Sequence, residues 1–346
     1  MKCCSECFSS SYLKDIINRN QSIGNCDFCG TKNINIYNPS ELSQIQYLLS
    51  LYVVAPEGSS IILQIDNDFP YKIFSNKIED KKLELLKETV RDDYESYKSL
   101  FENNIMLSHK IDTSKYEKVK PLQLSWEQLT EEIKYTNRFH LQNKLDLKKL
   151  KILLSRYKKP INKGRKFFRA RISSENGYML SEMSNPPKEK TRSGRANPTG
   201  ISYLYLADHI NTTLYEIRAS LYDYATIGEF RLKENIEVVN LRGDTYDPML
   251  LADNEELEDF LVHQPFITEL ELNLSKPKRR SDNELDYLPT QYLSEFIKSI
   301  GFDGVEFQSS LYSEGYNLAI FQPEKFECIN VQLCEIINID LNHRII

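Results

Sequence analysis

No apolar run in this 346-residue sequence approaches the roughly 18 residues that cross a bilayer, so we expect no membrane-spanning helix. The first residues (MKCCSEC) lack the apolar core of a signal peptide, and we therefore expect a cytoplasmic protein. A basic excess is missing too, because 44 Lys and Arg face 50 Asp and Glu, for a formal net charge of -6. Nonspecific duplex binding needs a basic face, so this composition argues against nucleic acid as the main partner.

Cysteine, by contrast, is present seven times, and in a reducing compartment this favours metal binding or free thiols over disulfides. Two C-x2-C pairs, Cys4/Cys7 and Cys26/Cys29, stand 18 residues apart. Two such pairs supply four thiolates in the tetrahedral arrangement that zinc prefers, and they leave no position for a catalytic water. The spacing predicts a structural Zn²⁺ site, with free thiols as the alternative and Cys3 as an alternative to Cys4.

The middle of the chain has mostly helical periodicity and carries no recognisable chemistry. Apolar residues recur at three- and four-residue spacing, and residues 59–65 suggest a short strand. The helices that we expect span residues 41–53, 80–104, 126–143 and 146–157. A lysine-rich turn segment at 158–164 (KKPINKG) predicts a domain boundary. We therefore expect three parts: a zinc knuckle at 1–38, a mainly helical domain at 39–160 and an α+β domain at 161–346.

Two arginines share one face of a predicted strand at 165–172, because side chains alternate along a strand. Two guanidinium groups, of Arg169 and Arg171, would cost free energy on that face unless the face contacts water or binds an anion. Guanidinium groups match the geometry of phosphate. An exposed edge strand is the alternative. The sequence continues with strands at 201–207, 226–232, 237–241, 304–310 and 317–321, and with a helix at 288–300 that Gly301 ends.

Residues 194–220 combine a loop (GRANPTG), a strand and the start of a helix near 211–213. The loop holds Arg195 and the strand holds Tyr203 and Tyr205, while Glu216 falls in the predicted first helical turn. There the helix dipole would favour a charged carboxylate, which could stabilise a sugar cation. Thr213 and Glu216 also fit a capping box, in which Glu216 would bond only to the helix start.

Five blocks of the carboxy-terminal half, in order, resemble the RES domain family. They are FRAR at 168–171, GRANPTG at 194–200, YLYLA at 203–207, EIRA at 216–219 and GVEFQSS at 304–310 ahead of Asn317. The resemblance covers roughly residues 160–325 and implies an ADP-ribosyltransferase-like α+β fold. It also implies cleavage of the nicotinamide–ribose bond of NAD⁺, with phosphate or water as acceptor, often in a toxin that an antitoxin partner restrains.

The resemblance assigns roles to residues of this chain. Arg169 is similar to the arginine that binds phosphate, Tyr205 to the aromatic that stacks on the ligand, and Glu216 and Ser309 to the acid and serine of the family name. Arg195 resembles a second cation near the pyrophosphate. Further expected ligand contacts are Tyr203, Arg171, Ser310 and Asn317. Because Ser309 and Ser310 are adjacent, the serine is uncertain by one position, and Gln308-Ser309 stands where short members have Pro-Ser.

Two other functions stay open at this stage. The same pocket would serve an ADP-ribosyltransferase that modifies a macromolecule. A regulatory module that binds nucleic acid is the third possibility, supported by the cysteine pairs and by a basic loop at 276–280 (KPKRR). The acidic net charge weighs against that third reading. The sequence leaves open whether the chain forms a homo-oligomer.

Overall fold

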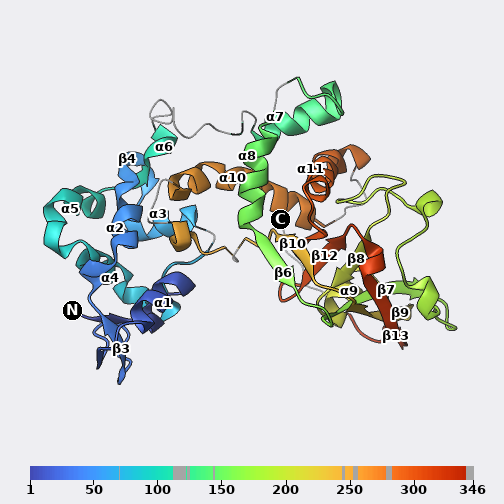
Figure 1. The fold of residues 1–346 in the computed structure, drawn as a ribbon, viewed down its shortest axis with the longest axis horizontal. Coiled ribbons are helices and arrows are strands. Elements are labelled where there is room, and N and C mark those ends of the chain that lie inside the picture. Colours follow the sequence, from blue (N-terminus) through green and yellow to red (C-terminus); the bar gives the residue numbers. More distant parts are fainter. Residues whose placement is uncertain are drawn as a thin grey trace. The chain divides into compact units, whose positions relative to one another are not determined.

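The computed structural model describes residues 1–69, 71–111, 122, 125–142, 145–243, 246–251, 256–277 and 283–339. Its contacts divide the chain into two compact units, each built from two stretches of sequence. The first unit consists of Met1–Pro121 and Gly243–Pro265, and the second of Leu122–Arg242 and Phe266–Ile346. Both contain helices and strands (Figure 1), which confirms the predicted α+β class.

The two units do not coincide with the three predicted parts. Residues 122–160 group with the second unit, and residues 243–265 return to the first. The predicted boundary at 160 rests on local composition. Local composition does not show that the chain leaves one unit and later returns to it. The division at 1–38, 39–160 and 161–346 therefore stays a prediction.

The first unit combines two small antiparallel sheets with short α-helices (α) and 3-10 helices (η). One sheet has the strand order β1-β3-β2, and the other pairs β4 with β5. Its elements are β1 (Cys3–Cys4), η1 (Ser5–Cys7), α1 (Ser11–Asn18), β2 (Ile23–Gly24), β3 (Ile34–Tyr37), η2 (Pro39–Glu41), α2 (Ser43–Ser50), β4 (Tyr52–Ser59), α3 (Ile61–Asp68), η3 (Asn76–Lys81), α4 (Lys82–Thr89), η4 (Arg91–Asp93), α5 (Tyr94–Glu102), β5 (Ile105–Leu107), α6 (Ser108–Ile111) and η9 (Pro248–Leu251). The long helix α10 (Glu256–Ser275) begins here and contains Pro265.

Two predicted elements of this unit are wrong. The expected strand at 59–65 is the helix α3, whose start is fixed by Gln64, because its side chain accepts a hydrogen bond from the Ser59 backbone N (3.1 Å). The expected helix at 80–104 is interrupted by η4, and α5 begins after Asp93, whose carboxylate accepts a hydrogen bond from Ser96 Oγ (2.7 Å). In both places a polar side chain accepts a hydrogen bond at the start of a helix, and hydrophobic periodicity does not show such a bond.

An eight-stranded sheet organises the second unit, in the order β13-β9-β7-β8-β12-β11-β10-β6. Neighbouring strands are antiparallel except β10 and β11, whose parallel pairing requires a long connection that includes α10 and α11. The elements are α7 (Trp126–Glu131), the π-helix η6 (Glu132–Thr136), α8 (Leu147–Arg156), β6 (Lys158–Ile161), β7 (Lys166–Ser173), η7 (Leu180–Glu182), η8 (Lys188–Lys190), β8 (Leu204–Ala207), α9 (Ile210–Glu216), β9 (Tyr224–Leu232), β10 (Ile236–Asn240), η10 (Glu284–Tyr287), α11 (Leu288–Ser299), β11 (Gly304–Gln308), β12 (Tyr316–Ile320), η11 (Pro323–Lys325) and β13 (Phe326–Glu335).

The main apolar core of this unit lies on one face of the sheet. Strands β8 and β12 contribute Leu204, Leu206, Leu318 and Ile320 to it. Because side chains alternate along a strand, Tyr205 and Asn317 point to the other face. Helix α9 lies against β7 and β8. The sheet and α9 together frame the site described below.

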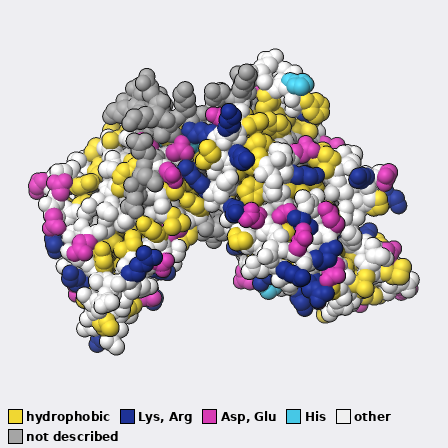
Figure 2. Space-filling model, in the orientation of Figure 1, with side chains coloured by type: hydrophobic (Ala, Val, Ile, Leu, Met, Phe, Trp, Pro, Cys, Tyr) yellow, Lys and Arg dark blue, Asp and Glu magenta, His cyan; other side chains and the backbone are white. Residues whose placement is uncertain are grey.

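Most predicted elements of the carboxy-terminal half are confirmed within a few residues, whereas β13 carries no signal that we recognised. Within the described ranges no helix has both the length and the apolar character that crossing a membrane requires. On the face shown in Figure 2, Lys and Arg side chains lie among Asp and Glu side chains. That mixture agrees with the net charge of -6.

Candidate active site

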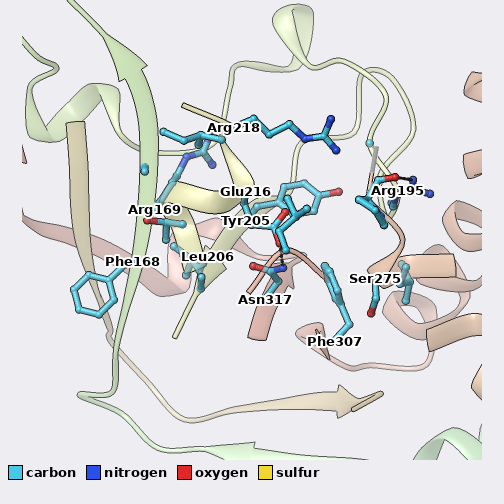
Figure 3. Close-up of a pocket in the computed structure, with 18 of the residues that line it drawn as sticks. Phe168, Arg169, Arg195, Tyr205, Leu206, Glu216, Arg218, Ser275, Phe307 and Asn317 are labelled. Carbon is cyan, nitrogen blue, oxygen red and sulfur yellow. Dashed lines mark hydrogen bonds between the residues drawn. The ribbon is translucent and has the colours of Figure 1, made fainter. Parts of the chain in front are cut away.

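A cavity of about 360 Å³ opens in the second unit, with walls from β7, β8, β12, α9 and the end of α10 (Figure 3). Phe168, Leu206 and Phe307 supply part of an apolar lining. The charged residues of the lining, within the part of the chain that the structure describes, are four cations and one acid: Arg169, Arg195, Arg218, Lys276 and Glu216. This balance of charge favours an anionic ligand.

Glu216 is the last residue of α9, whereas the sequence suggested its first turn. The helix begins at Ile210, earlier than predicted, and the side chain of its N-cap residue His209 makes no capping hydrogen bond. Thr213 Oγ1 donates to the Ile210 carbonyl (2.8 Å) and does not cap the helix. The capping box and the stabilisation of Glu216 by a helix amino terminus are therefore both wrong.

Two polar side chains hold Glu216 instead. Ser309 Oγ donates to Glu216 Oε1 (2.8 Å), and Asn317 Nδ2 donates to the same oxygen (2.7 Å). Ser309 is 2% exposed and follows β11, while Asn317 lies on β12 and lines the cavity. No described residue hydrogen-bonds to Oε2. One carboxylate oxygen is thus fixed by the protein, and the other is available to a ligand.

The loop between β11 and β12 packs on α9 and fixes the position of Glu216. Tyr312 stacks on Tyr215 with ring centroids 5.5 Å apart. Gly315 lies so close to α9 that a Cβ there would come within 1.9 Å of Thr212 Oγ1, so a residue with a side chain would displace the loop. Ser309 Oγ also accepts hydrogen bonds from two backbone N–H groups of the loop (3.3 and 3.2 Å). The serine therefore orders the loop and orients the acid together.

Arg169 follows the single position at which β7 pairs with β8, Phe168 with Ala207. It lines the cavity, and its Nη1 atom is buried with no hydrogen-bond partner among the described residues. Burial, and then the neighbouring charge of Arg171, lower the pKa of Arg169 to about 10. A buried donor without a partner costs free energy, which an anion bound in the cavity would recover.

Arg195 also lines the cavity, but its guanidinium is engaged elsewhere. Nη1 donates to the Asn273 carbonyl (3.3 Å) and Nη2 to the Pro277 carbonyl (3.1 Å), and the group lies over the ring of Tyr287 (4.9 Å). In the view of Figure 3, Arg195 and Arg169 lie on opposite sides of Glu216 and Tyr205. Arg195 therefore contributes positive charge to the cavity from a tethered position.

The remaining predicted ligand contacts divide into two groups. Tyr205 lines the cavity, and its hydroxyl donates to Asn197 Oδ1 (2.7 Å). Tyr203 lies outside the lining, where its ring packs on Phe321 with centroids 4.8 Å apart. Arg171 donates to the Glu182 carbonyl and covers the ring of Tyr178 (4.0 Å). Neither Ser309 nor Ser310 is part of the lining, but Ser309 is buried and hydrogen-bonds to Glu216, whereas Ser310 is exposed.

Three features of the site were missed in the sequence. Arg218 and Lys276 line the cavity, as does Pro277 beside Lys276, while residues 278–280 of the predicted basic loop lie outside the described residues. Gln291 of α11 donates through Nε2 to the carbonyls of Gly194 (2.7 Å) and Asn197 (3.1 Å), which holds the loop before β8. Arg218 could have been found from the EIRA block, because it lies two residues after Glu216. Gln291 belongs to no such block, so the sequence gives no comparable signal for it.

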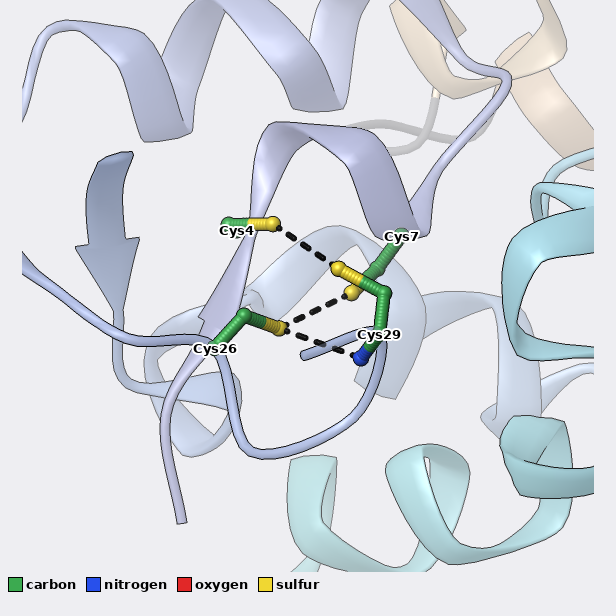
Figure 4. A group of neighbouring side chains, drawn as sticks. All are labelled: Cys4, Cys7, Cys26 and Cys29. Carbon is green, nitrogen blue, oxygen red and sulfur yellow. Dashed lines mark hydrogen bonds between the residues drawn. The ribbon is translucent and has the colours of Figure 1, made fainter. Parts of the chain in front are cut away.

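In the first unit, the four cysteines of the two C-x2-C pairs converge (Figure 4). Their Sγ atoms all lie within 4.8 Å of one another, with 3.4 Å between Cys4 and Cys29 and 3.3 Å between Cys7 and Cys26. Such a cluster can hold a metal ion such as zinc. Gly30, just after the second pair, has a φ of 73°, in the left-handed region that favours glycine.

Cys3 is excluded from this cluster, which resolves its ambiguity with Cys4. Its Sγ donates to the Tyr37 carbonyl (3.6 Å), and its side chain is fully buried. Burial, and then the nearby Cys26, raise the pKa of the Cys3 thiol. Cys3 thus belongs to the packing of the β1-β3 sheet.

Comparison with known proteins places the second unit in a family. Among solved structures, the chain is similar to a chain in the crystal structure of the M. tuberculosis MbcT–MbcA toxin–antitoxin complex, at 13% identity and a TM-score of 0.33, over 54% of this chain and 92% of that one. No curated protein matches this sequence. Residues 166–340, just over half of the chain, match the RES domain. The chain therefore belongs to the RES domain family.

Proposed function

We propose that this chain cleaves the nicotinamide–ribose bond of NAD⁺. The observation that carries the proposal is the carboxylate of Glu216, which Ser309 and Asn317 hold at one oxygen beside a cation-lined cavity. Membership of the RES family supports it, because Arg169, Glu216 and Ser309 carry the resemblance to that family. NAD⁺ is the substrate in this proposal, and no further organic cofactor takes part.

The proposed role of Glu216 follows from the charge that develops during the reaction. In NAD⁺ the nicotinamide ring is itself cationic and leaves the ribose as a neutral molecule, so its departure needs little help from an acid. The ribose carbon becomes positive as the bond breaks, and a fixed carboxylate beside it stabilises an oxocarbenium-like transition state. Ser309 and Asn317 hold that negative charge in place before the reaction begins. The free Oε2 atom is the one we expect to face the sugar.

The proposed binding of the dinucleotide uses the cations and the aromatic wall. Arg169 offers a buried, unpartnered Nη1 to the diphosphate, and charge-assisted hydrogen bonds of this kind are strong. Arg195 adds positive potential from its tethered position, and Tyr205 offers a ring face to the ligand.

Release of nicotinamide from NAD⁺ by the purified full chain tests the proposal directly. We expect nicotinamide from the wild type and at least a hundredfold less from Glu216→Gln, which keeps an oxygen that can accept both hydrogen bonds. A folded wild-type sample that releases no nicotinamide, with or without phosphate, would refute the proposal. Label from NAD⁺ recovered on protein or nucleic acid would instead support a macromolecular ADP-ribosyltransferase.

The acceptor is the second part of the proposal. Either water or inorganic phosphate can attack the ribose carbon, and the cationic lining favours phosphate. We expect the rate of nicotinamide release to rise with phosphate concentration and the product to be a phosphorylated ADP-ribose. A rate that is independent of phosphate, with free ADP-ribose as product, would assign hydrolysis.

We also propose that Cys4, Cys7, Cys26 and Cys29 bind a structural Zn²⁺. In a tetrahedral thiolate site with zinc–sulfur bonds of about 2.3 Å, neighbouring sulfurs lie about 3.8 Å apart. The separations of 3.3 and 3.4 Å, with all four atoms within 4.8 Å, agree with such a site. Elemental analysis of the purified chain should find about one zinc per molecule.

A regulatory protein partner of the antitoxin type is a further expectation from the family. It predicts that expression of the wild-type chain without its partner slows growth, whereas expression of Glu216→Gln does not. Equal growth with both chains, at equal protein levels, would remove this part of the proposal.

A further inference from the structure

Arg218 is a cation of the cavity that has no role in the proposed cleavage of NAD⁺. It lies two residues after Glu216, lines the cavity and is exposed. Figure 3 draws its side chain extending over Tyr205 and Glu216. No hydrogen bond or ion pair joins its guanidinium to any described residue. A charged side chain without a partner at the mouth of a ligand cavity is available for binding.

The backbone of Arg218 is held in a conformation that arginine rarely adopts. Its φ is 52°, and it directly follows Ile217, the C-cap residue of α9. Its N–H donates to the Tyr215 carbonyl (3.1 Å), which closes the helix end. Glycine is the preferred residue at this position, because a Cβ is disfavoured in the left-handed region. An arginine here costs stability, and such a cost is typical of functional positions.

The charges around Arg218 point to the chemistry of its ligand. Arg169 and Arg218 both line the cavity, and neither forms an ion pair with an acidic side chain among the described residues. Among the described residues of the lining Glu216 is the single acid, and its Oε1 atom is already occupied by two donors. A planar guanidinium matches the oxygens of a phosphoryl group with two parallel hydrogen bonds.

We propose that Arg218 binds a phosphoryl group at the mouth of the cavity, and that its left-handed backbone directs the side chain there. The phosphoryl group belongs either to the diphosphate of the substrate or to inorganic phosphate as acceptor. The inference rests on the proposed cleavage of NAD⁺, but the binding of an anion by Arg218 can be measured without turnover.

Arg218→Gly is the informative variant, because it removes the guanidinium and also removes the strain of a left-handed backbone at a residue with a Cβ. Tyr222→Gly is the matched control, since Tyr222 has a φ of 68°, is 74% exposed and does not line the cavity. We expect both variants to melt at or above the wild-type temperature. Arg218→Lys keeps the charge without the paired geometry and should fall between Arg218→Gly and wild type.

Calorimetric titration with ADP-ribose and, separately, with inorganic phosphate gives the binding readout. We expect Arg218→Gly to lose about tenfold in affinity for at least one probe, a modest figure because the group is exposed. Tyr222→Gly should bind both probes as the wild type does. A loss for ADP-ribose with a raised KM for NAD⁺ assigns the substrate diphosphate, and a loss for phosphate alone assigns the acceptor.

Wild-type affinity of Arg218→Gly for both probes would overturn the inference, as would a wild-type chain that binds neither. The proposed cleavage fails separately, when a wild-type chain that binds ADP-ribose releases no nicotinamide. A parallel loss of affinity in Tyr222→Gly would show that backbone relief, and not the guanidinium, causes the effect, which also overturns the inference.

Discussion

Replacement of Ser309 by alanine is the sharpest test of how the site holds its acid. The variant removes the 2.8 Å hydrogen bond from Oγ to Glu216 Oε1 and leaves the Asn317 bond to the same oxygen. A hydrogen bond to a charged group contributes about 1.5–3 kcal/mol, and about 1.4 kcal/mol corresponds to a tenfold change in rate. We therefore expect kcat for nicotinamide release to fall between about tenfold and a hundredfold, with little change in KM for NAD⁺.

The same change also affects stability, and the two effects must be separated. Ser309 Oγ accepts hydrogen bonds from the backbone N–H groups of Leu311 and Tyr312 (3.3 and 3.2 Å), so their loss should cost about 1–2 kcal/mol of unfolding free energy. Steady-state kinetics should therefore be measured well below both melting temperatures. A fall in kcat that persists there reflects the orientation of Glu216 and not unfolded protein.

Ser310→Ala is the matched control, since Ser310 is adjacent, exposed and outside the cavity lining. It should retain wild-type kinetics and stability. Asn317→Ala should resemble Ser309→Ala, and the double variant should lose less than the two single losses combined, because both donors serve one oxygen. Wild-type kcat in Ser309→Ala, or inactivation by Ser310→Ala instead, would refute the reasoning.

Four other perturbations follow from the same structure. Glu216→Gln should lower kcat about a hundredfold or more while its melting temperature stays close to that of the wild type, as differential scanning fluorimetry would report. Burial lowers the pKa of Arg169 to about 10, which leaves the guanidinium charged at neutral pH, so calorimetric affinity for ADP-ribose should stay constant as the pH is varied around neutrality. Cys26→Ser should lose bound zinc by elemental analysis and melt at a lower temperature, whereas Cys3→Ser should keep its zinc. Gly315→Ala should lower kcat without touching the cavity lining, because its Cβ would push the β11–β12 loop away from α9.

Regular patterns in the sequence were sufficient for part of this fold. The alternation around Arg169 predicted a strand at 165–172, and β7 spans Lys166–Ser173. The two C-x2-C pairs predicted a cluster that the four Sγ atoms form. Both patterns are local, because a strand or a cysteine knuckle is specified by a few neighbouring residues.

Elements whose limits depend on distant contacts were predicted poorly. Strand β13 is half-exposed at the edge of the sheet, and pairing with β9 specifies it more than its own sequence does. The return of residues 243–265 to the first unit has no local signal. Arg218 was missed as a cavity residue, because it lies at the cavity through a left-handed turn at the end of α9, which was itself misplaced.

The misplaced end of α9 changes the physical account of Glu216. Glu216 lies at the carboxy terminus of α9, so no helix amino terminus holds its carboxylate. The two donors on Oε1, Ser309 and Asn317, hold it instead, and both come from the β11–β12 hairpin. The orientation of Glu216 therefore depends on the docking of that hairpin on α9. It follows that the acid is assembled by tertiary packing, and a substitution that separates the hairpin from α9 should inactivate the site even when every residue of the cavity lining is unchanged.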